Sequence, residues 1–139
     1  MSDKQRPDIS KKNPYWLERH RYYELKHFCL QYSVWKKARA EIEGLVRIRY
    51  EPAFSFYDGS VSDPTFLAAE RRLYLTNRIE MVEQTARDTD PILGSYILRG
   101  VTEGCSYDVL NMRERVPCCK DIYYELYRRF FWLLDKVRK

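Results

Sequence analysis

Six polar or aromatic side chains near the end of the chain have types that can bind DNA. Arg128 can donate hydrogen bonds to guanine, and Lys120 can pair with guanine or with a phosphate. Tyr124 can touch a thymine methyl group or a phosphate, while the later basic residues can follow the DNA backbone. The residues predicted to bind DNA are Lys120, Asp121, Tyr124, Arg128, Arg129 and Lys136.

The first four of these residues recur at intervals that place them on one side of a helix. We expect this helix to run from about Cys118 to Lys139. Its opposite side carries apolar residues at helical spacing, which predicts a buried stripe. The expected buried residues are Ile122, Leu126, Phe130, Leu133 and Val137, broadened on one side by Tyr123, Tyr127 and Leu134.

A short helix and a turn precede this final helix. Ser106 has the side chain of a helix N-cap, so a helix of two or three turns is expected to begin there. The turn is expected over residues 113–117, because Pro117 has no amide to continue the helix before it. The residues expected to face inward are Val109, Leu110 and Met112. An isolated basic amphipathic helix is more often a solvated face of a bundle, but a short helix, a turn and a long helix together favour a helix-turn-helix.

Two long helices are predicted upstream. Apolar residues recur every three or four positions from Tyr15 to about Arg47, after the cap and proline signal of Asn13 and Pro14. The same signal at Asp63 and Pro64 begins a second helix that continues to about Asp88. Residues 49–63 between them are expected to form a loop. Asp90 and Pro91 begin a third, short helix that stops near Gly100 and Gly104, and no strand pattern persists, so the predicted fold class is all-α.

The length and composition of the chain fit one soluble domain. Its 139 residues can bury one core, with residues 13–88 as a long-helix scaffold and residues 90–139 as the helix-turn-helix part. No apolar stretch approaches the ~20 residues that span a bilayer, and the charged start of the chain does not resemble a secretory signal. A cytoplasmic protein with no membrane partner is therefore expected. The formal net charge of +5 suits phosphate attraction without requiring it.

Metal binding and catalysis are not expected. His20, His27 and Cys29 lie on one predicted helix, but a fourth ligand at zinc-site spacing is missing. Cys118 and Cys119 could sense oxidation at a helix start, although packing is the preferred interpretation of these thiols. The sequence has no glycine-rich phosphate loop and no nucleophile motif. We therefore expect a protein that is not an enzyme and has no cofactor.

The last ~50 residues resemble the helix-turn-helix of sigma-factor region 4, and with two long helices before it the whole chain resembles phage-encoded RinA/ArpU-type transcriptional regulators. The resemblance rests on the following residues: Tyr96-Ile97-Leu98-Arg99-Gly100, Glu103-Gly104-Cys105-Ser106-Tyr107-Asp108-Val109-Leu110, Ile122, Leu126 and Arg128. It implies a regulator in the cytoplasm of a bacterial host that binds promoter double-stranded DNA, with RNA polymerase as a second partner. The DNA contacts it implies are those of Lys120, Asp121, Tyr124 and Arg128.

Two other functions remain open from the sequence. The first is a small terminase subunit that binds phage DNA, and the second is a protein-binding helical module that inhibits a host complex. A homodimer is also expected, because the aromatic residues before and within the first helix are denser than one face can bury. These residues are Tyr15, Trp16, Tyr22 and Tyr23.

Overall fold

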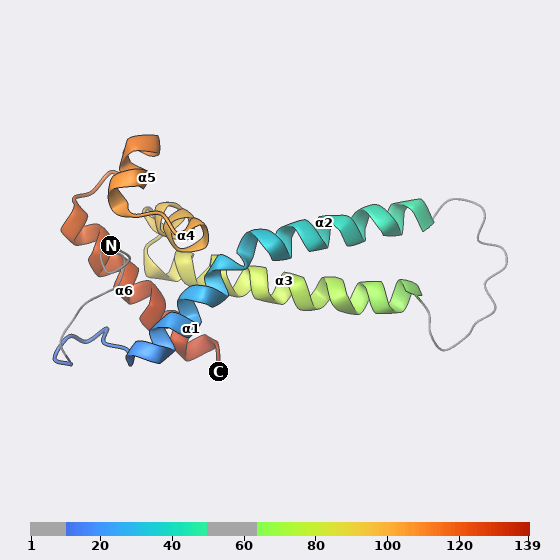
Figure 1. Cartoon of the computed structure of the whole chain (residues 1–139), viewed down its shortest axis with the longest axis horizontal. Helices are drawn as coiled ribbons and strands as arrows, with labels where there is room; N and C mark the ends of the chain where they lie inside the picture. Colours follow the sequence, from blue (N-terminus) through green and yellow to red (C-terminus); the bar gives the residue numbers. More distant parts are fainter. Residues whose placement is uncertain (1–10, 50–63) are drawn as a thin grey trace. The chain divides into compact units, whose positions relative to one another are not determined.

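The computed structural model describes residues 11–49 and 64–139 of the chain, and every regular element within these ranges is an α-helix (Figure 1). This confirms the all-α prediction. The helices are α1 (Arg19–Leu30), α2 (Tyr32–Arg49), α3 (Pro64–Thr89), α4 (Gly94–Glu103), α5 (Tyr107–Glu114) and α6 (Lys120–Val137). The predicted loop at residues 49–63 lies almost wholly outside the described residues.

The predicted first long helix is two helices. α1 begins only at Arg19, because the side chain of Glu18 accepts hydrogen bonds from the amides of His20 and Arg21 at 2.8 and 3.1 Å. α1 and α2 are separated at Gln31, whose backbone has φ −81° and ψ −4°. The sequence carries no proline or glycine at this point. Because the dihedral angles of Gln31 stay near helical values, the spacing of the apolar residues continues across the break. The periodicity therefore could not reveal the break.

The described residues form two units, and the division does not coincide with the expected one near residue 89. Residues 11–31 and 81–139 form the first unit, and residues 32–80, where described, form the second. α1 belongs with the C-terminal helices because it packs against α4 and α6. The first unit thus contains α1, the end of α3, and α4 to α6.

In the second unit α2 and the first part of α3 form a helical hairpin (Figure 1). Glu43 on α2 pairs with Arg72 on α3 at 2.9 Å, and the side chains of Arg39 and Thr76 approach to 3.4 Å. The buried side chains of this hairpin are Trp35, Ile42, Leu75 and Ile79. Helical spacing along each helix places these apolar residues on the side that faces the other helix.

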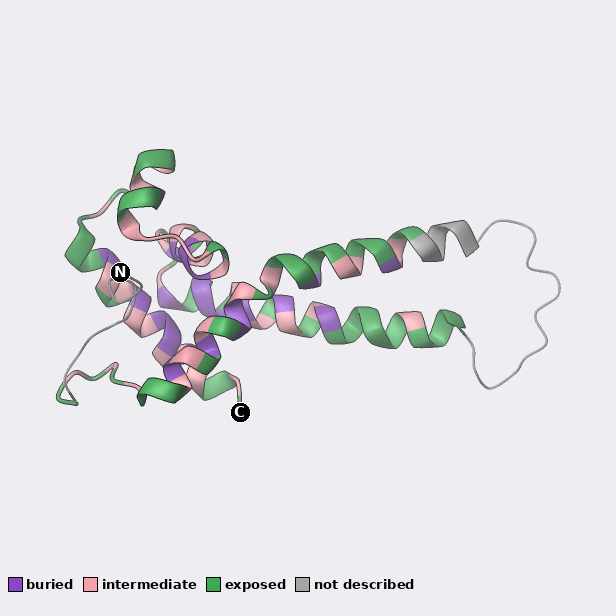
Figure 2. Cartoon of the chain, in the orientation of Figure 1, coloured by how far each residue is buried: buried purple, intermediate pink, exposed green. Residues whose placement is uncertain are grey.

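The first unit has an aromatic core, seen as buried segments of α1, α4 and α6 in Figure 2. The hydroxyl groups of Tyr22 and Tyr127 lie 3.2 Å apart, and the ring of Tyr22 packs against Phe131 with centroids 5.2 Å apart. Burial and the neighbouring Tyr22 raise the pKa of Tyr127 well above its ordinary value. The buried apolar side chains of this unit include Leu25, Phe28, Val82, Ile97, Val101, Leu110, Tyr123, Phe130 and Leu134.

The predicted buried side of the final helix is confirmed in part, because Phe130 and the three residues expected to broaden the stripe are buried, while two residues of the stripe itself are exposed. α6 buries Tyr123, Tyr127, Phe130, Phe131 and Leu134, whereas Ile122 and Val137 are 49% and 54% exposed. The sequence interpretation centred the buried side on the line from Ile122 to Val137 and placed Tyr123, Tyr127 and Leu134 at its border. Tyr123 and Tyr127 lie at the centre of the buried side, where their rings bury a large apolar area, and the Tyr127 hydroxyl lies 3.2 Å from that of Tyr22.

The inward side of α5 also differs from the prediction. Leu110 is buried, but Val109 is exposed and Met112 is 88% exposed. The side that packs against α4 and α6 is the one with helical spacing through Tyr107, Leu110 and Glu114. Val109 and Met112 lie on the opposite side of this short helix, which places two apolar side chains at the surface.

The crowded aromatic residues before and within α1 are largely used inside the unit. Tyr22 is buried, so it is not one of the aromatic residues of this cluster that could face a second copy. Tyr15 packs edge-on against Trp132 with ring centroids 5.5 Å apart. Trp16 is exposed, and the ring of Tyr23 lies under the guanidinium of Arg19 at 5.9 Å. The cluster therefore serves mainly to pack α1 and the segment before it against α6.

Candidate nucleic-acid interface

Residues 115–119 form the connection between α5 and α6, and side chains hold its shape. Ser106 caps the start of α5, accepting from the amide of Val109 at 3.3 Å, which confirms the predicted cap. Arg115 ends the helix with φ 53°, a left-handed conformation that non-glycine residues adopt infrequently. The side-chain oxygen of Asn111 then accepts from the amide of Val116 at 2.9 Å. The conformation of the connection is therefore set by side-chain caps and hydrogen bonds within residues 106–116.

Two tyrosines join the start of α6 to α5. The hydroxyl of Tyr107 donates to the carbonyl of Cys118 at 2.6 Å, just before α6 begins. In the opposite direction the hydroxyl of Tyr124 accepts from the amide of Tyr107 at 3.1 Å, and this amide is one of those a helix start leaves without a helical partner. Lys120 and Asp108 add an exposed ion pair at 3.4 Å. These contacts fix the first turn of α6 on α5.

The surface that this geometry presents consists of the outward side of α6. Asp121, Ile122 and Glu125 are exposed there, opposite the side that buries Tyr127 and Leu134. The two carboxylates lie one helical turn apart, and the apolar side chain of Ile122 lies beside them. The surface is therefore acidic and apolar, with Lys120 at its edge.

The structure places the six predicted DNA-binding residues in different surroundings. Lys120, Asp121 and Lys136 are exposed, and the ammonium of Lys136 lies 3.5 Å from the centroid of the Trp132 ring. Tyr124, Arg128 and Arg129 are half-buried. The expectation that Tyr124 and Arg128 lie opposite the core is wrong, because the buried side of α6 is rotated toward them.

Three of these side chains make or approach internal contacts. Tyr124 accepts the amide of Tyr107, as described above. Arg129 donates to the carbonyl of Thr89 at 3.2 Å and lies 3.5 Å from the hydroxyl of Tyr15. The Nε atom of Arg128 is buried and has no hydrogen-bond partner among the described residues. Each of these residues is thus partly committed to the fold of the unit.

Ile122 and Glu125 were missed as surface residues by the sequence interpretation. Ile122 had been assigned to the buried stripe, and Glu125 had no assigned role. Centring the buried side on Tyr123 and Tyr127, in place of putting them at its border, would have placed Ile122 and Glu125 outward, since adjacent helical positions differ by about 100°. The signal was present in the spacing of the tyrosines.

Exposed basic residues lie near the connection and in the last turn of α6. Arg113 pairs with Glu103 at 2.9 Å, and Arg115 is exposed where α5 ends. Lys136 is exposed in the last turn of α6. Cations at these places have the charge to bind phosphate groups, whereas the carboxylates of Asp121 and Glu125 repel phosphate and accept hydrogen bonds from donor groups.

The cysteines are free thiols with differing exposure. Cys29 is buried, Cys105 and Cys118 are half-buried, and Cys119 is exposed. Burial raises the pKa of the Cys29 and Cys118 thiols, which lowers the fraction of reactive thiolate. Within residues 11–49 and 64–139 no three His, Cys, Asp or Glu side chains lie together as they would to hold a metal ion.

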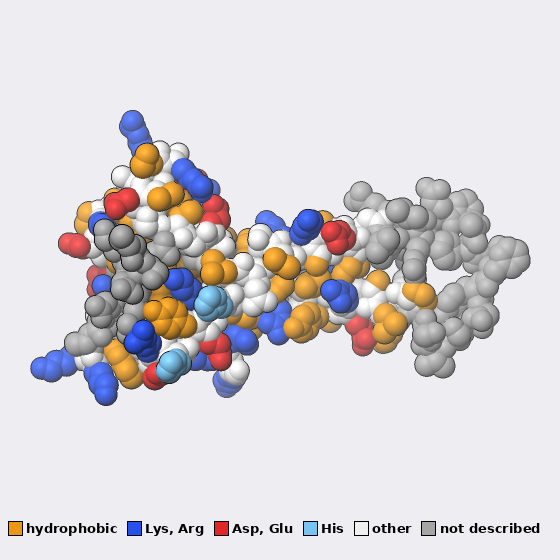
Figure 3. Space-filling view, viewed as in Figure 1, with side chains coloured by type: hydrophobic (Ala, Val, Ile, Leu, Met, Phe, Trp, Pro, Cys, Tyr) orange, Lys and Arg blue, Asp and Glu red, His pale blue; other side chains and the backbone are white. Residues whose placement is uncertain are grey.

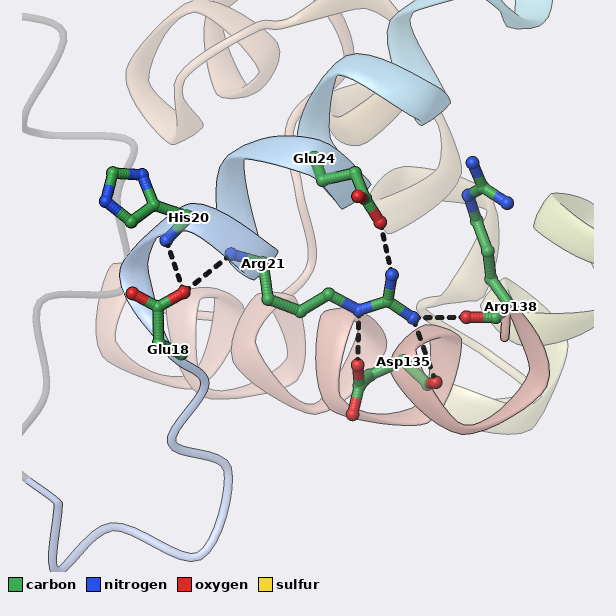
Figure 4. A network of polar contacts seen from close by, with 6 residues as sticks. All are labelled: Glu18, His20, Arg21, Glu24, Asp135 and Arg138. Carbon is green, nitrogen blue, oxygen red and sulfur yellow. Dashed lines mark hydrogen bonds and ion pairs between the residues drawn. The ribbon is translucent and has the colours of Figure 1, made fainter.

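A cluster around Arg21 joins α1 to the end of α6 (Figure 4). The Nε atom of Arg21 donates to the carboxylate of Asp135 at 2.6 Å, and Nη2 donates to the carbonyls of Asp135 and Arg138. Nη1 pairs with Glu24 on α1 itself. The hydrogen bond to Asp135, with further contributions from Glu24, raises the pKa of Arg21. One guanidinium therefore satisfies carbonyls that the C-terminus of α6 leaves free.

Replacing Arg21 with methionine is expected to reduce the free energy of unfolding by about 1–3 kcal/mol, because charged hydrogen bonds to Asp135 and two carbonyls are lost. Arg87→Met is a matched control, since exposed Arg87 bonds only to the neighbouring Gln84 among the contacts described for it. The control should change stability by less than ~0.5 kcal/mol. Urea unfolding followed by circular dichroism measures both, and equal effects would contradict the assigned role of Arg21.

Comparison with known proteins finds no family model that matches the chain, no matching curated protein and no matching solved structure. Among the helices of the described residues, none combines the length and apolar character needed to cross a membrane.

Proposed function

We propose that α4, α5 and α6 act as a helix-turn-helix that binds double-stranded DNA with the first turns of α6 in the major groove. One observation carries this proposal: the Tyr107–Cys118 and Tyr124–Tyr107 hydrogen bonds fix the exposed start of α6 on a short preceding helix. A helix used to read DNA needs a defined position relative to its support and a free outward side. The resemblance to RinA/ArpU-type regulators supports the same class, a phage transcriptional regulator in a bacterial host and not an enzyme.

The outward residues of α6 favour a particular readout. Asp121 and Glu125 can accept hydrogen bonds from the amino group of cytosine, and Ile122 can contact the methyl group of thymine. This replaces the guanine contact expected from Arg128, which is half-buried. Arg115 and Lys120 beside the start of α6, and Lys136 in its last turn, are candidates for phosphate contacts. In this proposal acidic and apolar groups specify the site, and surrounding cations supply much of the affinity.

Selection of DNA by the purified chain from a random duplex library tests the proposal. An enriched motif containing cytosine and thymine is expected. Glu125→Gln and Ile122→Ala should each weaken binding to that motif by ~1–3 kcal/mol, which is the range for a lost base contact. Binding to random DNA should be unchanged by Ile122→Ala, and unchanged or tighter in Glu125→Gln, since removing a carboxylate lessens repulsion of phosphate.

Ile92→Ala is the matched control for Ile122→Ala, because Ile92 is an exposed isoleucine that lies before α4. It should leave the affinity for the motif unchanged. Absence of any DNA binding at low salt would refute the proposed function. Binding without sequence preference would reject the base contacts of Asp121, Ile122 and Glu125 and leave only attraction to phosphate.

A second candidate function is binding of another protein through the same region. The observation that favours it is the exposure of Val109, Met112 and Ile122, apolar side chains that interfaces cover. In this case the acidic groups of α6 would face a basic protein surface, with RNA polymerase the first partner to test. Met112→Ser would then abolish capture of polymerase by the chain, whereas a chain that only binds DNA would retain its motif affinity in this variant.

A further inference from the structure

Basic side chains from two distant parts of the chain meet beside the second half of α6. The segment before α1 lies against this half of the helix, because the ring of Tyr15 packs on Trp132 with centroids 5.5 Å apart and its hydroxyl lies 3.5 Å from Nη1 of Arg129. Figure 3 shows Lys and Arg side chains together where this segment leads into α1. We call the following residues the basic surface: Lys11, Lys12, Trp16, Arg129, Trp132 and Lys136.

None of the cations of the basic surface forms an ion pair with a carboxylate of the described residues. The ammonium of Lys11 lies over the ring of Trp16, 5.8 Å from its centroid. Lys136 lies in the same way over Trp132. An aromatic ring attracts a cation through its negative face but carries no net charge to neutralise it. These ammonium groups therefore keep their charge for an anion.

The carboxylates nearest to the basic surface do not neutralise it. Glu18 accepts hydrogen bonds from the amides that begin α1, and Asp135 pairs with Arg21. Glu125 lies one helical turn before Arg129, yet no ion pair joins the two side chains in the described part of the chain. The surface is thus complementary to a partner that carries negative charge.

The helix dipole of α6 accounts for only part of this arrangement. A cation in the last turn of a helix is favoured by the dipole, which explains Lys136. Lys11 and Lys12 are exposed and belong to the segment before α1, so the stability of α6 does not require them. From Tyr15 to Arg129 the two parts of the surface are 114 positions apart in the sequence. The fold, and not one helix, brings these cations together.

We propose that the basic surface binds the phosphate backbone of the DNA duplex whose major groove holds the first turns of α6. This inference rests on the proposed function and adds to it a contact region that includes the segment before α1. α6 has 18 residues and is therefore about 27 Å long, whereas the major groove is about 12 Å wide. A helix with its first turns among the bases carries its last turns toward a flanking phosphate strand, where the basic surface lies.

The basic surface continues the side of α6 that is proposed to read the bases. Arg129 and Lys136 follow Glu125 by one turn and by three turns on the same outward side of the helix. Along this side the carboxylates come first and the cations follow. Lys and Arg are the main donors to phosphate oxygens, and a duplex carries one negative charge per ~1.7 Å of its length, so several cations can each meet a phosphate.

Replacing Lys11 and Lys12 together with alanine tests the basic surface. At about 0.1 M salt the double variant is expected to bind random duplex DNA at least about five-fold more weakly than the native chain. The plot of log affinity against log salt concentration should become less steep by up to ~2, since each lost phosphate contact removes ~0.9. Affinity for the selected motif should fall by the same factor, because phosphates carry no sequence information. Anisotropy of a labelled duplex measures each affinity.

The matched control replaces Lys36 and Lys37 with alanine. These lysines are also adjacent and exposed, but they lie on α2 in the second unit, and their loss changes the net charge of the chain by the same amount. At about 0.1 M salt the Debye length is about 10 Å, so cations away from the DNA contribute little. The control should leave both the affinity and its salt dependence unchanged. Equal losses in the two double variants would overturn the proposal, because net charge alone would then explain them.

The remaining outcomes separate this surface from the base contacts of α6. A loss confined to the Lys11 and Lys12 variant, in a chain without sequence preference, would support the basic surface and reject the base contacts. A chain that prefers its motif but binds equally well without Lys11 and Lys12 would overturn the basic surface and leave the proposed function standing. Absence of duplex binding by the native chain at low salt would overturn both.

Discussion

Replacing Phe131 with alanine is expected to lower the free energy of unfolding by about 3–5 kcal/mol. Phe131 is fully buried, and its ring contacts Tyr22, Tyr127 and Phe130 with centroid separations of 5.0–5.2 Å. Removing the ring loses apolar burial and leaves a cavity among aromatic side chains that cannot collapse easily. Since a domain of this kind is stable by ~5–15 kcal/mol, this single change removes a large part of the total. Urea denaturation followed by circular dichroism measures the loss.

Val137→Ala provides the comparison for this variant. The sequence pattern places Val137 in the buried stripe of the last helix, but the structure leaves it 54% exposed. Its replacement should change stability by less than ~0.5 kcal/mol. The pair of variants thus tests which side of α6 faces the core, and a greater loss in Val137→Ala than in Phe131→Ala would show that α6 is rotated from its described position.

Replacing Gly100 with alanine is expected to destabilise the first unit by about 1–3 kcal/mol, the range for overpacking a core. A Cβ atom at Gly100 would clash with the hydroxyl oxygen of Tyr123, a side chain that is itself buried. The gain in helix propensity from glycine to alanine is only ~1 kcal/mol and does not offset this clash. Either α4 must move from α6 or the ring of Tyr123 must leave its position.

Tyr123→Phe in the same chain should remove most of this loss. The Tyr123 hydroxyl is buried without a hydrogen-bond partner among the described residues, so deleting it alone should be nearly neutral. The double variant retains only a close contact to the ring carbon at 3.3 Å. Gly44→Ala is the control, because no atom lies within 4 Å of its Cβ position, and it should stabilise the chain by ~0.5–1 kcal/mol. A loss in Gly100→Ala that Tyr123→Phe does not reduce would contradict the described packing.

Helix capping and proline signals predicted much of the fold. Ser106 caps α5 as expected, and Pro64 is the first residue of α3. These signals are local, because one side chain decides whether a few backbone amides are satisfied. The break at Gln31 was not predictable in this way, since no proline or glycine marks it in the sequence.

The candidate site was predicted as a region but not as a set of residues. The short helix, the connection and the final helix were all located, while the outward side of the final helix was misassigned. Tyr124 shows the reason: its ring and hydroxyl suit a DNA contact as well as an internal bond, and only the position of the Tyr107 amide selects between them. A tyrosine can lie in the core or at the surface, because its ring is apolar and its hydroxyl is polar, so helical spacing alone does not decide which side of the helix it occupies.

The association of α1 with α6 has a consequence for how the chain folds. Arg21 and Asp135 are 114 positions apart, and Tyr22 and Tyr127 are 105 positions apart, so the first unit is closed by residues from distant parts of the sequence. Bringing such residues together carries an entropic penalty that nearby contacts avoid. The α2–α3 hairpin needs no partner from α6, so we expect it to form earlier during synthesis. Packing of α1 would then be delayed until α6 has left the ribosome, and the apolar side of α1 would stay exposed to chaperones until then.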